Sequence, residues 1–224
     1  MKSLTERTRE IEQLMQYAVP EDRRTEAFSL LHKHAGDGVA LSVFHNFYSF
    51  LPEGLDDAIA ILCLLARKES KFLLSATTAI DDYLYLADTE NAVFLGPLRE
   101  GIWEDEVLHF FGYKDREAFT KAHRDPAQFP VYVPACLDQH LCPVCHAAEG
   151  EYHTLGCPVE VCPWCGGQLT SCPCRFSRLG IHEMDRETQV DELLDLLNAQ
   201  GRIPFDAARQ SPAYPVTPAD LGGD

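Results

Sequence analysis

The stretch from Cys142 to Cys174 reads CPVCHAAEGEYHTLGCPVEVCPWCGGQLTSCPC and holds seven of the nine cysteines of this 224-residue chain. It contains two turns of the form Cys-Pro-x-Cys, which begin at Cys142 and Cys162. In such a turn the proline fixes φ, and the tight backbone brings both thiolates towards one point where a metal ion can bind them. Two of these turns so close together predict a metal-binding module.

A structural zinc ion takes four ligands, and the sequence supplies further donors next to each turn. His153 and Cys157 lie between the two turns, and Cys172 and Cys174 follow the second. Taken in chain order, the donors form two sets of four, one with three cysteines and a histidine and one with cysteines alone. These sets are Cys142, Cys145, His153 and Cys157, and then Cys162, Cys165, Cys172 and Cys174.

Other divisions of these donors are also consistent with the spacing. The two turns could share one ion as a single ribbon, because their separation is typical of zinc ribbons, or the pairs could interleave in a cross-brace. Spare donors lie nearby, and the pair Cys136-x-x-x-His140 is the one best able to displace an assigned ligand. The remaining spare donors are His146 and His182.

The sequence predicts two zinc ions with a structural role. Four protein ligands close a site, whereas a catalytic zinc keeps one position open for water. The segment has few large apolar side chains, but metal ligation of about 10–16 kcal/mol can hold such a segment folded. Iron is the alternative metal, because four thiolates can also hold a single iron or a cluster.

A longer run around the second turn carries a family resemblance. It comprises His153-Thr-Leu-Gly-Cys157, then Cys162-Pro-Trp-Cys165-Gly-Gly-Gln-Leu-Thr-Ser-Cys172-Pro-Cys174, with Gly201-Arg-Ile-Pro-Phe205 downstream. This run resembles zinc-ribbon and treble-clef-type knuckle modules, and it is similar to a segment of a bacterial protein family of uncharacterised function. The resemblance covers residues 142–206, and it implies a bacterial zinc module without implying an activity.

The chain is strongly acidic, with a formal net charge of −16. Such a surface repels phosphate backbones at long range, so we expect no non-specific nucleic-acid binding. Within residues 136–180, Arg175 and Arg178 are the only Lys or Arg side chains, which also disfavours nucleic acid. A protein partner with basic residues suits this charge better than nucleic acid does, but a role in solubility alone is the preferred explanation of the acidity.

No membrane or secretory segment is expected. The N-terminus has no basic region followed by an apolar run, and the most apolar window, Ala58–Ala66, is about half as long as a membrane-spanning helix. We therefore expect a cytoplasmic protein, in which Cys-x-x-Cys pairs more often bind metal than form disulfides.

Residues 1–130 are expected to form an α+β domain. Ser3 and Glu6 fit a capping box for a helix over 4–18, and further helices are expected from Arg24, over 39–51 with Asp37 as its cap, and over 55–68. Segments rich in β-branched and aromatic residues predict a small antiparallel sheet from 77–80, 83–86 and 92–95. Helical spacing resumes over 101–111 and after Asp115.

A proline-rich connector over 125–135 separates this domain from the zinc-knuckle module at 136–180. Residues 181–224 are expected to form a final helix capped by Asp185 and ended by Gly201, followed by an extended proline-rich tail that Ile203, Phe205 and Tyr214 could hold against the body.

No catalytic motif is evident in the sequence. Glu106-x-x-His109 is half of a di-iron motif without a second copy, and Cys136 near His140 is a weak candidate for a nucleophile with its base. The favoured hypothesis is a protein-interaction or adaptor protein in which zinc is structural. The alternative is an enzyme of the hydrolase class with its active site in the N-terminal domain, and nucleic-acid binding through the zinc module ranks third.

Overall fold

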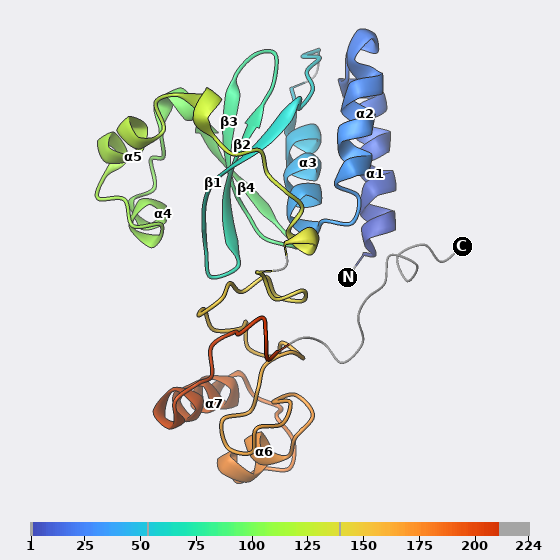
Figure 1. Ribbon diagram of the computed structural model, residues 1–224. Coiled ribbons are helices and arrows are strands. Elements are labelled where there is room, and N and C mark those ends of the chain that lie inside the picture. The colour runs from blue at the N-terminus through green and yellow to red at the C-terminus, as the bar shows by residue number, and fades with distance from the viewer. Residues whose placement is uncertain (1, 53, 139, 211–224) are drawn as a thin grey trace. The chain divides into compact units, whose positions relative to one another are not determined.

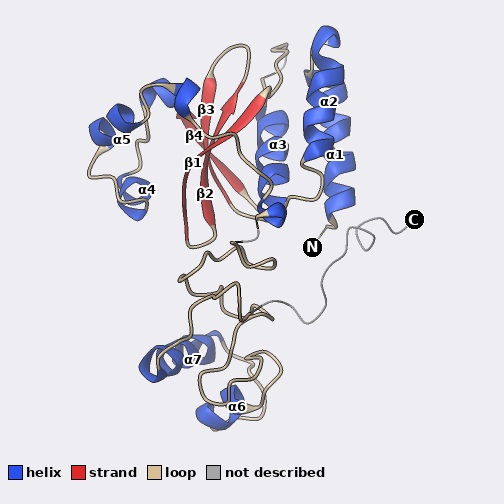
Figure 2. Ribbon diagram, viewed as in Figure 1, coloured by secondary structure: helices blue, strands red, loops and turns tan. Residues whose placement is uncertain are grey.

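The computed structural model describes residues 2–52, 54–138 and 140–210, with the side chains of Ala127 and Cys136 left out. The chain divides into two compact units, Met1–Leu137 and Asp138–Asp224. The first unit combines helices with a four-stranded antiparallel sheet, and the second is a cysteine-rich region with a final helix (Figures 1 and 2). The predicted α+β class is confirmed.

Three helices begin the first unit, at α1 (Leu4–Ala18), α2 (Arg24–Lys33) and α3 (Gly38–Phe50). The predicted capping box of Ser3 and Glu6 is present, and the carboxylate of Asp37 caps α3 by accepting from the Val39 N–H at 2.8 Å. The other carboxylate oxygen of Asp37 accepts a hydrogen bond from the hydroxyl of Tyr132 at 2.9 Å. This buried carboxylate therefore ties the start of α3 to a segment almost a hundred residues later.

The sheet is a meander of β1 (Ile61–Lys68), β2 (Lys71–Thr77), β3 (Asp82–Ala87) and β4 (Ala92–Pro97), in that spatial order. The helix predicted over 55–68 is wrong, because its second half is β1. The strand predicted over 77–80 is also wrong, since β2 ends at Thr77 and a turn follows. The predicted strands around 83–86 and 92–95 are confirmed as β3 and β4.

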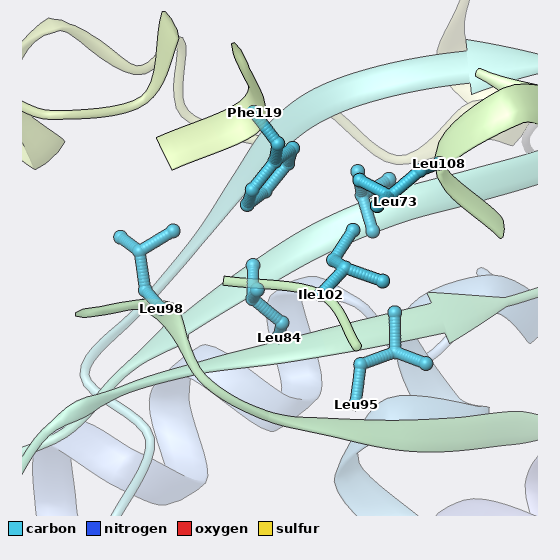
Figure 3. Packing of buried hydrophobic residues seen from close by; sticks show 7 residues of the cluster. All are labelled: Leu73, Leu84, Leu95, Leu98, Ile102, Leu108 and Phe119. Atoms are coloured by element: carbon cyan, nitrogen blue, oxygen red, sulfur yellow. The ribbon is translucent and has the colours of Figure 1, made fainter. Parts of the chain in front are cut away.

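Helices cover both faces of the sheet, which explains the first of these errors. On one face α3 packs against β3 and β4, and on the other lie α4 (Asp105–Phe110) and α5 (Arg116–Ala122) (Figure 1). Leu73, Leu84 and Phe119 belong to the core of this second face, which Figure 3 shows. Strands buried on both sides read as continuous apolar runs without the alternation that marks a strand.

The remaining helices of this unit are short. The helix expected over 101–111 is limited to α4, whereas Asp115 caps α5 as predicted through a 2.8 Å bond from the Ala118 N–H. Single turns of 3-10 helix occupy Glu21–Arg23, Leu98–Glu100, Pro126–Gln128 and Ala135–Leu137.

The proline-rich segment expected to be a connector pairs with the outer edge of β1. The Leu64 N–H donates to the Pro130 carbonyl at 3.0 Å, and the Tyr132 N–H donates to the Leu62 carbonyl at 2.8 Å. These bonds place residues 130–132 in the first unit and cover one edge of the sheet.

The second unit has little regular structure apart from α6 (Cys174–Leu179) and α7 (Glu187–Gln200), as Figure 2 shows. Gly201 ends α7 as predicted, but the residue at its N-cap is Arg186 and not Asp185. Phe205 is buried against Cys142 and Cys157. Residues 211–224 of the expected tail, which include Tyr214, lie outside the described residues.

Candidate metal centres

The eight predicted donors of the second unit meet in two groups of four. Within each group, one ligand atom from every residue lies within 4.8 Å of the others. The division follows chain order, and neither a shared ion nor an interleaved arrangement would group the donors in this way. The groups are Cys142, Cys145, His153 and Cys157, called site 1 below, and Cys162, Cys165, Cys172 and Cys174, called site 2.

The distances in site 1 fit a tetrahedral metal ion. The sulfur atoms of Cys142 and Cys157 are 3.8 Å apart, and the Cys145 sulfur lies 3.3 Å from Nδ1 of His153. Four sulfurs at about 2.3 Å from a zinc ion would be separated by about 3.8 Å. A disulfide would instead bring two sulfurs to about 2 Å. Both groups are therefore compatible with metal binding.

The electrostatics of site 1 favour a cation among the donors. Contacts with the thiols of Cys142 and Cys157 hold the pKa of Cys145 far below its ordinary value, and contacts with Cys142 and Cys145 raise the pKa of Cys157. Burial opposes a charge on His153, but the sulfurs of Cys142 and Cys145 raise its pKa to about 10. Closely packed sulfurs thus favour a thiolate at Cys145, and a thiolate is the form that binds metal.

Site 2 is more open to solvent. Cys162 is fully buried, whereas Cys172 and Cys174 are half-buried and Cys165 is exposed. The backbone N–H of Gly167 and the neighbouring thiols lower the pKa of Cys165. The contact with Cys165 raises the pKa of Cys174 to about 12. As in site 1, one thiol of the group is held ready as a thiolate.

The two Cys-Pro-x-Cys turns have the same backbone structure. In the first, the Cys142 N–H donates to the Ala147 carbonyl at 2.8 Å, and in the second the Cys162 N–H donates to the Gly167 carbonyl at 2.7 Å. Each turn is flanked by a single antiparallel bridge, Leu141 with Ala148 and Val161 with Gln168. The similarity of the doubled motif therefore extends to the hydrogen bonds of the backbone.

One position of the turn has a left-handed backbone. Gly166 fills it in the second turn with φ of 73°, and His146 fills it in the first with φ of 58°. Glycine adopts this conformation without strain, whereas a residue with a Cβ adopts it less readily. The first turn therefore forms without the glycine that eases the second.

His153 is fixed by residues far away in the sequence. Its Nε2–H donates to Oε1 of Gln210 at 2.9 Å, and its ring packs edge-on against Phe205 with centroids 5.3 Å apart. Because Nε2 is taken by this hydrogen bond, Nδ1 is the ring nitrogen that is directed towards Cys145 and that could bind a metal ion. Metal-binding histidines commonly donate their other N–H in this manner, which fixes both the ring and its tautomer.

A buried ion pair joins Glu160, which lies between the two sites in the sequence, to Arg202, which follows α7. Arg202 donates to the carboxylate of Glu160 at 2.6 Å and to the carbonyl of His153 at 2.6 Å. The Glu160 side chain is 1% exposed and that of Arg202 is 8% exposed. Sequence reasoning missed Glu160, Arg202 and Gln210, because each acts through a contact between distant parts of the chain.

The spare donors do not join either group. His140 and His182 are exposed, and His146 is buried but outside both groups. The side chain of Cys136 lies outside the described part of the chain, so the proposed pair of Cys136 and His140 lies outside it too.

The weak catalytic candidate on α4 does not form a centre. Glu106 and His109 are both exposed, and among the described residues neither belongs to a group of three or more metal-binding side chains.

Comparisons with protein-family models, with curated proteins and with solved structures find no match for this chain. Among the described residues, no helix combines the length and the apolar character that crossing a membrane requires.

Proposed function

We propose that the chain binds two zinc ions in its second unit, that both ions are structural, and that the protein acts by binding another protein. The observation that carries this proposal is that eight donors form two complete sets of four, with every ligand atom of a set within 4.8 Å of the others. A complete set of four protein ligands leaves no position for a reacting water.

The donor chemistry favours zinc over iron. Three thiolates with one imidazole, and four thiolates, are both common ligand sets of structural zinc. Iron–sulfur centres are most often held by four thiolates, so iron fits site 2 better than it fits site 1 with its histidine. When bound, each ion would cross-link four side chains that are otherwise joined by few apolar contacts.

A structural role also follows from how little else holds the second unit together. The buried side chains around site 1 include Cys142, Cys157 and Phe205, so the ligands themselves form much of this small core. Around site 2, Cys162 packs with Leu169, Leu193 and Leu197. The core of site 1 is made largely of metal ligands, so a metal ion there would provide much of the folding free energy.

The protein-binding role rests on charge and on the lack of a catalytic arrangement in the closed sites. A net charge of −16 disfavours nucleic acid and favours a partner with basic residues. A cytoplasmic location is part of the same proposal, because free thiols in this number persist in a reducing compartment.

Metal analysis of the full chain tests this proposal. We expect two zinc ions per chain, with X-ray absorption that fits seven sulfurs and one nitrogen in total over the two sites. A single ion, or a coloured iron centre, would contradict the assignment. A reaction that stops on chelation while the second unit stays folded would show that a zinc ion is catalytic and would replace the proposed role.

A further inference from the structure

An aromatic pocket lies in the first unit, between the end of α3 and strands β3 and β4. Its volume is about 550 Å³, and five of its lining residues are aromatic, namely Phe47, Phe50, Tyr83, Tyr85 and Phe94. Phe50 is 78% exposed and Phe94 is 49% exposed, which is unusual for such large apolar side chains. A pocket of this size and composition is typical of binding sites.

The neighbouring strand β4 lies at the edge of the sheet. Its strand partner among the described residues is β3 alone, whereas the opposite edge, β1, is covered by residues 130–132. Val93 is 54% exposed and lies beside Phe94 on this edge. An edge strand presents backbone N–H and carbonyl groups that can pair with another extended chain.

The surroundings of this edge are acidic. Residues 38–97, which comprise α3 and the sheet, carry eight acidic and three basic side chains. Asp88 and Glu90 lie in the turn that leads into β4, where Lys71 is already paired with Asp88 and the guanidinium of Arg7 donates to the Thr89 carbonyl. The charge disfavours a second copy of this chain at the edge, because each copy carries a net charge of −16.

We propose that the edge of β4 and the aromatic pocket together bind an extended peptide segment of a partner protein, rich in basic and apolar residues. The peptide adds to β4 as a fifth strand and places one apolar side chain in the pocket, while its basic residues face the acidic turn. This inference rests on the proposed protein-binding function and names the chemistry of the partner. Strand addition combines backbone hydrogen bonds with side-chain pockets in this manner.

The alternation of side chains along a strand explains how the pocket would select its ligand. Every second side chain of the added strand points to the face of the sheet that carries α3 and the pocket. Phe94 contacts the rings of Tyr83 and Tyr85, with centroids 5.9 and 5.6 Å away. These three rings form the surface against which the side chain of the bound peptide would pack. An aromatic or branched aliphatic side chain fills such a pocket best.

A library of random linear peptides, selected against the zinc-loaded full chain, tests the proposal. We expect the selected peptides to alternate apolar with polar or basic residues, and to slow amide hydrogen exchange in Ala92–Pro97. Phe50→Ser and Phe94→Ala should each weaken binding by about tenfold or more, as expected for an aromatic at the centre of an interface. Tyr17→Ala removes an aromatic that is 87% exposed on α1, outside the pocket, and should change nothing.

Four results would overturn the proposal. The first is a selection that yields no peptide, and the second is a set of peptides whose affinity does not depend on Phe50 or Phe94. The third is peptide binding that leaves amide hydrogen exchange in β4 unchanged. The fourth is a dimer of the chain that Phe94→Ala abolishes. The Phe50 side chain is largely exposed to solvent, so Phe50→Ser should leave the fold intact. A loss of binding in this variant would therefore report on the pocket and not on unfolding.

These results are separable from the proposed function. A partner that binds through residues 138–210 would leave the protein-binding function standing while the strand-addition site fails. A single zinc ion, or a chelator-sensitive reaction, would instead contradict the proposed function whatever the peptides do.

Discussion

Site 1 and site 2 share the same Cys-Pro-x-Cys turn but differ in what surrounds it. In site 1, Cys142 is fully buried and His153 is 2% exposed, whereas in site 2 Cys165 is exposed to solvent. The ring of His153 is also held by Gln210 and Phe205. The comparison teaches that the turn supplies two of the four donors of each site, while the surrounding chain supplies the other two and determines how firmly a metal would be kept.

The two sites also depend on different parts of the C-terminal segment. Site 1 packs against Phe205, beyond the last helix, and site 2 packs against Leu193 and Leu197 of α7. Each site therefore connects a local turn to a later element, so the loss of either metal should loosen a different part of the second unit.

Removal of both ions is the largest perturbation. We expect residues 138–210 to lose their structure, because ligation contributes about 10–16 kcal/mol per structural zinc site. Site 2 should release its ion first, since Cys165 is exposed. Hydrogen exchange during chelation would follow both events, with α1 as an internal control that stays protected. Release from site 1 first, or an α7 still protected after both ions have left, would contradict this.

Replacement of one ligand at each site compares the two directly. Cys142→Ser and Cys165→Ser should each lower the zinc content from two ions to one, because each removes one of four ligands. Cys142→Ser should reduce solubility more, since it leaves an unpartnered set of donors in a buried core. Metal content and the soluble fraction measure these effects. A soluble Cys165→Ser chain with two zinc ions would remove Cys165 from the ligand set.

Loss of the buried ion pair should be the next largest effect. Glu160→Gln leaves the charge of Arg202 without a counter-charge, and breaking such a pair costs about 3–5 kcal/mol. Urea unfolding of the second unit would measure the cost. Glu192→Gln, at an exposed position of α7, is the matched control and should have little effect. Equal stabilities of the two variants would show that the pair does not stabilise the unit.

The smallest expected effect is a loss of metal affinity that is confined to site 1. Gln210→Ala removes the acceptor of the His153 N–H, and loss of such an outer contact typically lowers metal affinity by about 10- to 100-fold. Site 2 should keep its affinity, and Gln200→Ala at an exposed position is the control. Competition with a zinc chelator measures both sites. An equal decrease at both would mean that Gln210 acts on the whole unit.

Local signals in the sequence predicted much of the fold. The capping box at Ser3 and the cap at Asp37 both rest on residues a few positions apart, and both are present. The helix predicted over 55–68 failed because β1 belongs to a sheet covered on both faces. The hairpin between β1 and β2 was missed because its turn residues, Glu69 and Ser70, have φ of 49° and 62° although neither is glycine or asparagine.

The same distinction applies to the metal centres. All eight donors were recognisable because cysteines and histidines at such short spacing are typical of metal ligands. Glu160, Arg202 and Gln210 were not recognisable, since the hydrogen bonds that define their roles join residues 42 to 57 positions apart. Contacts of that range depend on the folded chain and leave no local pattern.

The division of donors in chain order has a consequence for the order of assembly. Each set of ligands closes a short loop, and closing a short loop costs little conformational entropy. During synthesis the ligands of site 1 are complete once Cys157 has been made, long before Gln210 joins the chain. A metal ion could therefore bind an incomplete site 1 first, and the later hydrogen bond from His153 to Gln210 would then fix the ring and slow the loss of that ion.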